Sequence, residues 1–78
     1  MEKSKRCIVF LGGNKESLPG IKIAIKKKLL IVVCDKSTKA PARLYADHFI
    51  NSSIYKPLEI YKKIKKKKLK IDGIMSLS

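Results

Sequence analysis

Apolar residues fall along the chain in short uninterrupted runs that alternate with lysine-rich segments. The strands predicted from these runs cover 6–11, where Arg6 precedes the apolar 7–11, and 29–34; a third covers 48–50, where His48 precedes Phe49-Ile50, and a fourth lies within 71–78. Uninterrupted runs of this length are typical of parallel strands that are buried on both faces. The pattern therefore predicts four strands, the last of them entered through a turn.

Two segments between these runs place apolar residues at helical spacing. The first helix is predicted over 17–28, where Ser17 and Pro19 fit a helix start. The second is predicted from residue 54 or 57 to residue 67, with lysines on its outer side and in its last turn. The expected inward-facing residues are Leu18, Ile21, Ala24 and Ile25 in the first helix, and Leu58, Tyr61, Ile64 and Ile60 in the second.

The order of these elements sets the expected topology. A strand, a helix and a strand are followed by a loop with a short helical turn at 44–46, then a strand, a helix and a strand. This alternation predicts an α/β fold in which a small Rossmann-like sheet of four parallel strands, in the order 3-2-1-4, has helices on its faces. At 78 residues, we expect one small domain over 1–78.

The first strand runs directly into Gly12-Gly13-Asn14, which carries the sharpest chemical suggestion in the sequence. Backbone amides at such a turn before a helix can bind a phosphate or a carboxylate. The letters GGNKES lack the third glycine of the dinucleotide-binding fingerprint. Two interpretations stay open: contact with an anionic ligand, and a turn that only needs positive backbone angles.

Two further polar residues are expected on the same edge of the sheet, because they lie at the carboxyl ends of parallel strands. Asp35 follows the second strand, where it would accept a hydrogen bond from a ligand hydroxyl or cap the loop over 36–39. Ser76 falls near the end of the fourth strand, where its hydroxyl would face the same ligand edge.

The charge is strongly positive, with 19 Lys and Arg against 6 Asp and Glu and a formal net charge of +13. This excess raises a basic nucleic-acid-binding function as one hypothesis. Arg6 and Arg43 are the only arginines, and bidentate recognition of guanine or phosphate favours arginine. The lysines are not interleaved with an aromatic cluster. The composition therefore argues against specific nucleic-acid binding.

Catalytic and metal-binding residues are not predicted. Cys7 and Cys34 lie inside apolar runs without metal-ligand spacing, so we expect buried free thiols. His48 is the sole histidine and follows Asp47, and it has no nucleophile or metal partner in the sequence pattern. No apolar run approaches the length of a membrane span. A cytoplasmic location without membrane contact is the expectation.

Several motifs together resemble a known family. They are IVFLGG, LPG at the first helix, IVVCDK, AP followed by YAD, and IDGIMSLS at the end. In this combination the chain resembles the N-terminal domain that precedes the ATP-grasp fold in ligases similar to the carbamoyl-phosphate synthase large subunit and biotin carboxylase. The resemblance covers nearly the whole chain. Asn14 departs from it where a third glycine is frequent, and Lys27-Lys28 replaces a glycine that commonly ends the first helix.

The resemblance implies a substrate-side role. In that family the domain flanks the active site, and its glycine turn and strand ends help to hold a carboxylate or amine substrate. ATP and Mg2+ are expected only in the ATP-grasp domains that follow, so no cofactor is expected in this chain. The substrate- or anion-binding positions carried over by the resemblance are Gly12, Gly13, Asn14, Asp35 and Ser76.

The resemblance also implies partners. Family members continue well beyond the fourth strand, so we expect an N-terminal fragment of a longer ligase that is inactive when isolated, or a module that docks on a partner subunit. Apolar surface left uncovered would favour self-association or a partner interface. The alternative hypothesis is an autonomous nucleotide or small-anion binding module.

Overall fold

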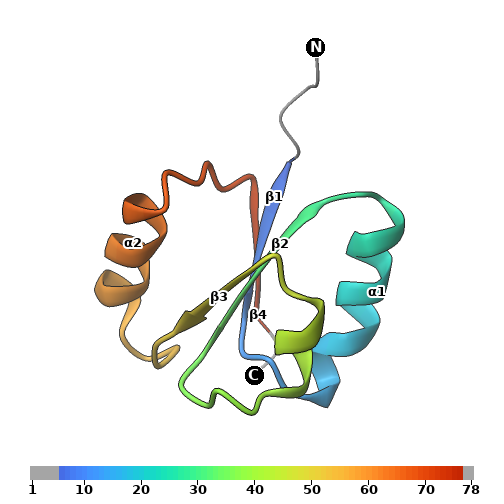
Figure 1. The fold of residues 1–78 in the computed structure, drawn as a ribbon, viewed down its shortest axis with the longest axis horizontal. Coiled ribbons are helices and arrows are strands. Elements are labelled where there is room, and N and C mark those ends of the chain that lie inside the picture. Colours follow the sequence, from blue (N-terminus) through green and yellow to red (C-terminus); the bar gives the residue numbers. More distant parts are fainter. Residues whose placement is uncertain (1–5, 77–78) are drawn as a thin grey trace.

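The computed structural model describes residues 6–76, in which strands and helices alternate along the chain (Figure 1). The strands are β1 (Cys7–Leu11), β2 (Leu30–Asp35), β3 (His48–Asn51) and β4 (Gly73–Ser76). The α-helices are α1 (Leu18–Lys26) and α2 (Pro57–Lys66), and the short 3-10 helices are η1 (Lys15–Ser17) and η2 (Pro41–Tyr45). The predicted strands are thus all present, although residues 77–78 of the fourth predicted segment lie outside the described residues.

The four strands form one parallel sheet in the order β3-β2-β1-β4, which confirms the predicted α/β fold and strand order. Leu11 at the end of β1 is in register with Cys34 of β2 and with Ser76 of β4. Asp35 is in register with Asn51 at the end of β3. The strands therefore finish along one line, which we call the carboxyl rim.

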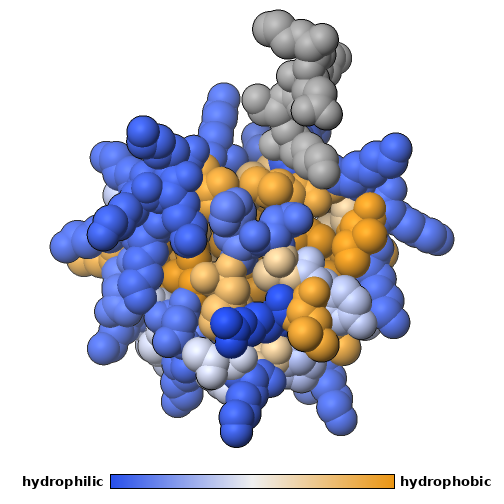
Figure 2. Space-filling view, viewed as in Figure 1, coloured by the Kyte–Doolittle hydropathy of each residue, from blue (hydrophilic) through white to orange (hydrophobic). Residues whose placement is uncertain are grey.

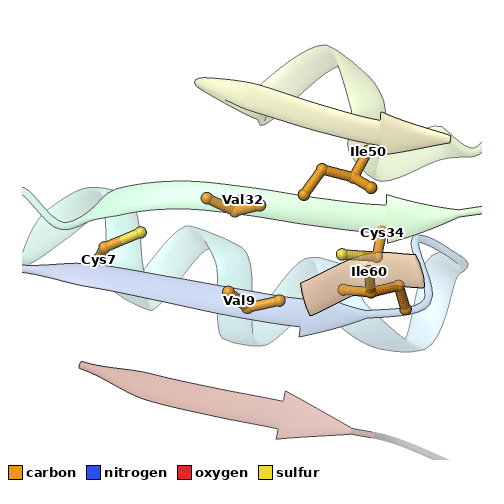
Figure 3. Close-up of a cluster of buried hydrophobic side chains, with 6 residues drawn as sticks. All are labelled: Cys7, Val9, Val32, Cys34, Ile50 and Ile60. Atoms are coloured by element: carbon orange, nitrogen blue, oxygen red, sulfur yellow. The ribbon is translucent and has the colours of Figure 1, made fainter. Parts of the chain in front are cut away.

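Two layers of apolar side chains pack against the sheet. On one face Ile60 of α2 joins a buried cluster with Cys7, Val9, Val32, Cys34 and Ile50, and Figure 3 shows Ile60 beside Cys34. On the other face α1 and η2 contribute Ile21, Ala24 and Ala42, which pack against Phe10, Ile31 and Val33. Successive residues of β1 and β2 alternate between these layers, so both central strands are buried on both sides, as predicted. Figure 1 shows α2 on one side of the sheet and α1 with η2 on the other.

The second helix was predicted from residue 54 or 57 to residue 67, and α2 agrees to within one residue, whereas the first helix ends earlier than predicted. The first was expected to reach residue 28, but α1 ends at Lys26 and Lys28 takes a positive φ of 57°. The amide of Leu29 then donates to the carbonyl of Ala24. Lys68 repeats this φ of 57° after α2. Because the left-handed conformation is usual for glycine and not for lysine, the residue type at 28 did not mark the end of the first helix.

The predicted inward stripe of α2 is only partly correct. Ile60 is buried and Ile64 packs on the core, but Leu58 is 74% exposed and Tyr61 is 59% exposed. In α1, Ile21 and Ala24 are buried as expected, whereas Ile25 is 46% exposed. The side of α2 that carries Leu58 and Tyr61 has no covering element among residues 6–76. The helical periodicity was predicted correctly, but fewer residues of each apolar stripe are buried than predicted.

Aspartates fasten the opposite end of the sheet, where the strands begin. Asp47 precedes β3, and its carboxylate Oδ2 accepts the amide of Ile31 at 2.8 Å while its own amide donates to the carbonyl of Ile31. Asp72 precedes β4 and makes the same pair of bonds with Cys7. The Asp47 carboxylate therefore holds strand β2, which agrees with a structural reading of the Asp47-His48 pair.

The two cysteines are buried free thiols, as predicted. Figure 3 shows Cys7 near the start of β1 and Cys34 near the end of β2. The register sets Cys34 opposite Leu11, which leaves the two cysteines about 13 Å apart along the strands at about 3.3 Å per residue. That separation is too large for a disulfide.

We predict that neither thiol reacts with a disulfide reagent such as DTNB in the folded chain. Burial raises the pKa of Cys34 from 9.0 to about 11, so the thiol stays protonated at neutral pH. The raised pKa also stabilises the folded chain fully below pH 9.0, and this contribution is lost as the pH rises toward about 11. Absorbance at 412 nm measures the reaction. Cys34→Val lacks the thiol and is the control for the loss of stability at alkaline pH. Rapid labelling of native Cys34 would contradict the prediction.

Candidate functional site

The glycine turn lies at the carboxyl rim directly after β1, and each glycine is required for a different reason. Gly12 has a φ of +101°, a conformation that residues with a side chain rarely adopt. Gly13 has no space for a side chain, because a Cβ there would lie 3.0 Å from Ala40 Cβ and 3.0 Å from Val33 Cγ1. The turn therefore combines a special backbone angle with close packing against the start of η2.

Asp35 ties the glycine turn to the loop after β2. Its carboxylate Oδ2 accepts the amide of Gly13 at 2.8 Å, and its Oδ1 accepts the amide of Ser37 at 2.9 Å. The amide of Gly12 donates to the carbonyl of Cys34 at 2.8 Å. The amides of both glycines are thus engaged within the chain. Asp35 thus caps the loop after β2, and of the two glycines Gly12 has the positive backbone angle that the turn interpretation expected.

Side chains that the sequence reasoning missed complete this network. Ser17 was expected to cap the first helix, but its buried hydroxyl makes no capping bond and donates to the carbonyl of Gly12 at 2.8 Å. Asn51 donates from Nδ2 to the carbonyls of Asp35 at 3.1 Å and Lys36 at 2.8 Å. The signal for Asn51 was its position as the first polar residue after the apolar Phe49-Ile50, at the end of β3 on the same rim.

A second set of polar contacts anchors the end of β3 to α2. The buried hydroxyl of Ser52 donates to Glu59 Oε1 at 2.8 Å, and Lys63 Nζ donates to the carbonyl of Asn51 at 2.9 Å. Lys63 also lies 3.4 Å from Glu59 Oε1. The hydrogen bonds from Ser52 and then Lys63 lower the pKa of the exposed Glu59. Helix α2 is thereby fixed to the rim.

Asn14 and Ser76 are the two predicted site residues whose side chains are exposed. Asn14 stands between the glycine turn and η1, and Ser76 is in register with Leu11 on the neighbouring strand. The structure therefore brings Gly12, Gly13, Asn14, Asp35 and Ser76 to one rim. Contact between any of them and a ligand stays a prediction.

At this rim the carboxylate of Asp35 accepts two backbone amides. At the opposite end of the sheet the carboxylates of Asp47 and Asp72 each accept one. Within residues 6–76, no group of three or more His, Cys, Asp or Glu side chains is arranged to hold a metal ion. Lys15 and Lys36 adjoin the turn and Asp35 in sequence, and both are exposed. The exposed groups suit a polar or anionic ligand.

Figure 2 shows long hydrophilic side chains around much of the viewed face, with hydrophobic residues between them. None of the helices in the described part of the chain has both the length and the apolar character needed to cross a membrane.

Among the comparisons with known proteins, the one with solved structures gives a match. No protein-family model matches the sequence, and no curated protein sequence does. The fold is similar to the crystal structure of N5-carboxyaminoimidazole synthetase from Staphylococcus aureus complexed with ADP, with a TM-score of 0.74 and 26% sequence identity. The similarity covers 97% of this chain and 20% of that chain, so the chain spans about a fifth of its length. The match confirms that the chain resembles the N-terminal domain of an ATP-grasp ligase.

Proposed function

We propose that this chain serves as the substrate-side N-terminal domain of an ATP-grasp ligase, of the carboxylate-amine or carbamoyl-phosphate synthase-like kind. The proposal depends on one observation, the structural similarity to the synthetase. That similarity covers 97% of this chain and 20% of the synthetase. The rest of the ligase, or a partner subunit, would then supply the domains that bind ATP and Mg2+. The assembly would work in the cytoplasm.

The geometry of the carboxyl rim supports a role in holding substrate. In parallel α/β sheets, ligands bind outside the carboxyl ends of the strands. The carboxylate of Asp35 accepts the amides of Gly13 and Ser37, and the amide of Gly12 donates to the carbonyl of Cys34. These bonds fix the rim. In this proposal they shape the site, and the exposed side chains of Asn14 and Ser76 contact a carboxylate or amine group of the substrate.

The proposal includes inactivity of the isolated chain. Its aspartates within residues 6–76 hold backbone amides, and a ligase reaction needs groups that bind and polarise the nucleotide phosphates. Those groups would come from the ATP-grasp domains.

Calorimetric titration of the 78-residue chain tests the proposal against its alternative. We expect no micromolar affinity for MgATP or NAD, because the nucleotide would bind elsewhere in the ligase, and at most weak binding of simple carboxylates. Micromolar binding of either nucleotide, abolished by Asn14→Ala and kept by Ser53→Ala, would contradict the proposal. That result would favour an autonomous nucleotide-binding module.

The coding sequence downstream of Ser78 provides an independent test. A reading frame that continues into an ATP-grasp domain is the expected result. A frame that continues into an unrelated fold would overturn the proposal, and a stop codon at that point would contradict its single-chain form.

A further inference from the structure

The loop that joins β2 to η2 is held by a series of hydrogen bonds. Asp35 Oδ1 accepts the amide of Ser37, and the hydroxyl oxygen of Ser37 accepts the amide of Lys39 at 3.2 Å. A guanidinium N–H of Arg43, in η2, donates to the carbonyl of Thr38 at 2.8 Å. The loop and η2 therefore hold each other in place beside the carboxyl rim.

Arg43 is held from two sides. Besides the bond to Thr38, its guanidinium carbon lies 4.9 Å from the centroid of the Phe49 ring in β3. A guanidinium carries several N–H donors, so others stay available to a ligand after the bond to Thr38. The contacts with Phe49 and Thr38 reduce the side-chain entropy that would be lost when a ligand binds. Arg43 is thus a preorganised donor, and it is exposed.

A shallow hollow of about 550 Å³ lies beside Arg43. The connection between β2 and β3 supplies its whole lining, which consists of Thr38, Lys39, Ala40, Pro41, Arg43 and Leu44. Leu44 is 88% exposed and gives the hollow an apolar border next to its two cations. Strands β2 and β3 lie on the side of β1 away from β4, so the walls of the hollow do not depend on any segment that follows β4.

The hollow has an excess of positive charge. Residues 36–46 include three cations and no acidic residue. Within residues 6–76, no carboxylate forms an ion pair with Lys39 or Arg43. A guanidinium fork matches two oxygens of a phosphate or a carboxylate, and a phosphate monoester carries a charge of about −1.5 to −2 at pH 7. The two cations therefore balance a phosphate monoester, whereas a carboxylate would balance only one of them.

We propose that this hollow binds the phosphate group of a small phosphorylated molecule. Arg43 would donate to two of the phosphate oxygens and Lys39 to a third, while the organic part would rest against Pro41 and Leu44. The volume of the hollow is typical of small-molecule sites. The inference does not rest on the proposed function, because none of the residues proposed to shape or contact the substrate site at the rim lines the hollow.

Titration followed by amide NMR shifts tests the proposal on the full 78-residue chain at about 0.15 M salt. The probes are phenyl phosphate, inorganic phosphate and benzoate, which has the ring of phenyl phosphate but a single charge. We expect a Kd of about 1 mM for phenyl phosphate and about threefold weaker binding of inorganic phosphate, which lacks the ring. Benzoate should bind at least about fivefold more weakly than phenyl phosphate. The largest shifts should fall within residues 37–44.

Each comparison has a result that overturns the proposal. Equal binding of benzoate would remove the requirement for a phosphate dianion. Equal or tighter binding of inorganic phosphate would make this a site for the free ion and not for a phosphorylated molecule. Shifts of similar size over the lysines of α2 would indicate unspecific charge attraction. Absence of binding at about 20 mM phenyl phosphate would overturn the proposal as well.

Matched variants separate ligand binding from a purely structural role of Arg43. Arg43→Lys keeps the charge but loses the fork, so phenyl phosphate should bind about fivefold more weakly. Lys39→Gln should weaken binding about threefold, whereas Lys22→Gln on α1 removes the same charge elsewhere and should stay within about 1.5-fold. Leu44→Ser should weaken phenyl phosphate binding to the level of inorganic phosphate.

The Arg43 Nε–H resonance of the unmodified chain gives a readout that needs no variant. It should shift with the same Kd as the backbone amides, because the fork contacts the phosphate. An unmoved resonance, or unchanged binding by Arg43→Lys, would show that Arg43 only holds the loop, and either result would overturn the proposal. Binding that depends on Asn14 or Ser76 reads the carboxyl rim instead, so failure of the proposed function is recognised separately.

Discussion

Gly13→Ala is expected to lower the free energy of unfolding by about 2 to 3 kcal/mol, measured by urea denaturation followed by circular dichroism. The added Cβ would lie 3.0 Å from both Ala40 Cβ and Val33 Cγ1. The first of these atoms is fixed to the backbone, and Val33 is fully buried, so neither neighbour can move aside easily. The loss is large against a total stability of roughly 4 to 12 kcal/mol for a chain of this size.

Two other glycines serve as controls for this result. At Gly73 the nearest atom to an added Cβ is Ile8 Cγ1 at 4.0 Å, so Gly73→Ala should leave stability unchanged or slightly higher. At Gly12 nothing lies within 4 Å of an added Cβ, but the φ of +101° is strained for alanine. Gly12→Ala should therefore cost about 1 to 2 kcal/mol from backbone strain alone. Equal stabilities for Gly13→Ala and Gly73→Ala would show that the close packing around Gly13 is absent.

Asp35→Ala should destabilise the fold by about 2 to 4 kcal/mol, because it leaves the amides of Gly13 and Ser37 without their acceptor. The same experiment has a local readout. Hydrogen exchange at the Gly13 amide should accelerate more than exchange at the amides of β2, because the turn loses its tie before the sheet opens.

Two further variants, a conservative replacement of Asp35 and a replacement of another acidic residue, serve as comparisons for Asp35→Ala. Asp35→Asn keeps one side-chain oxygen and should lose about half as much stability, since its amide group cannot accept the second bond. Glu16→Ala changes an exposed acidic residue of η1 and should stay within about 0.5 kcal/mol of the unmodified chain. If Asp35→Ala were as stable as Glu16→Ala, the role of the carboxylate in holding the rim would be refuted.

The sheet could be predicted from the sequence because its two central strands are buried on both faces and therefore appear as uninterrupted apolar runs. Strands joined by helical crossovers had to be parallel. Asp35 and the glycine pair then had to emerge at one edge. This reasoning needed only the period and the order of apolar residues.

The details that failed depend on contacts between segments far apart in the sequence. Lys28 ends α1 in a conformation that glycine usually adopts, so local preference gave no warning. Leu58 fits the inward stripe of a helix, but whether it is covered depends on what packs beside α2. Ser17 fits a helix cap, but the carbonyl of Gly12 comes within reach only after the turn has formed. Periodicity describes one segment at a time and carries no such information.

The bonds that converge on Asp35 have a consequence for recognition. Its side-chain and main-chain oxygens together accept from Gly13, Ser37, Asn51 and Ser52. These bonds tie together the segments that bear the four residues without help from a ligand. A molecule that binds at this edge would meet a preorganised surface, so little conformational entropy of the protein would be lost on association.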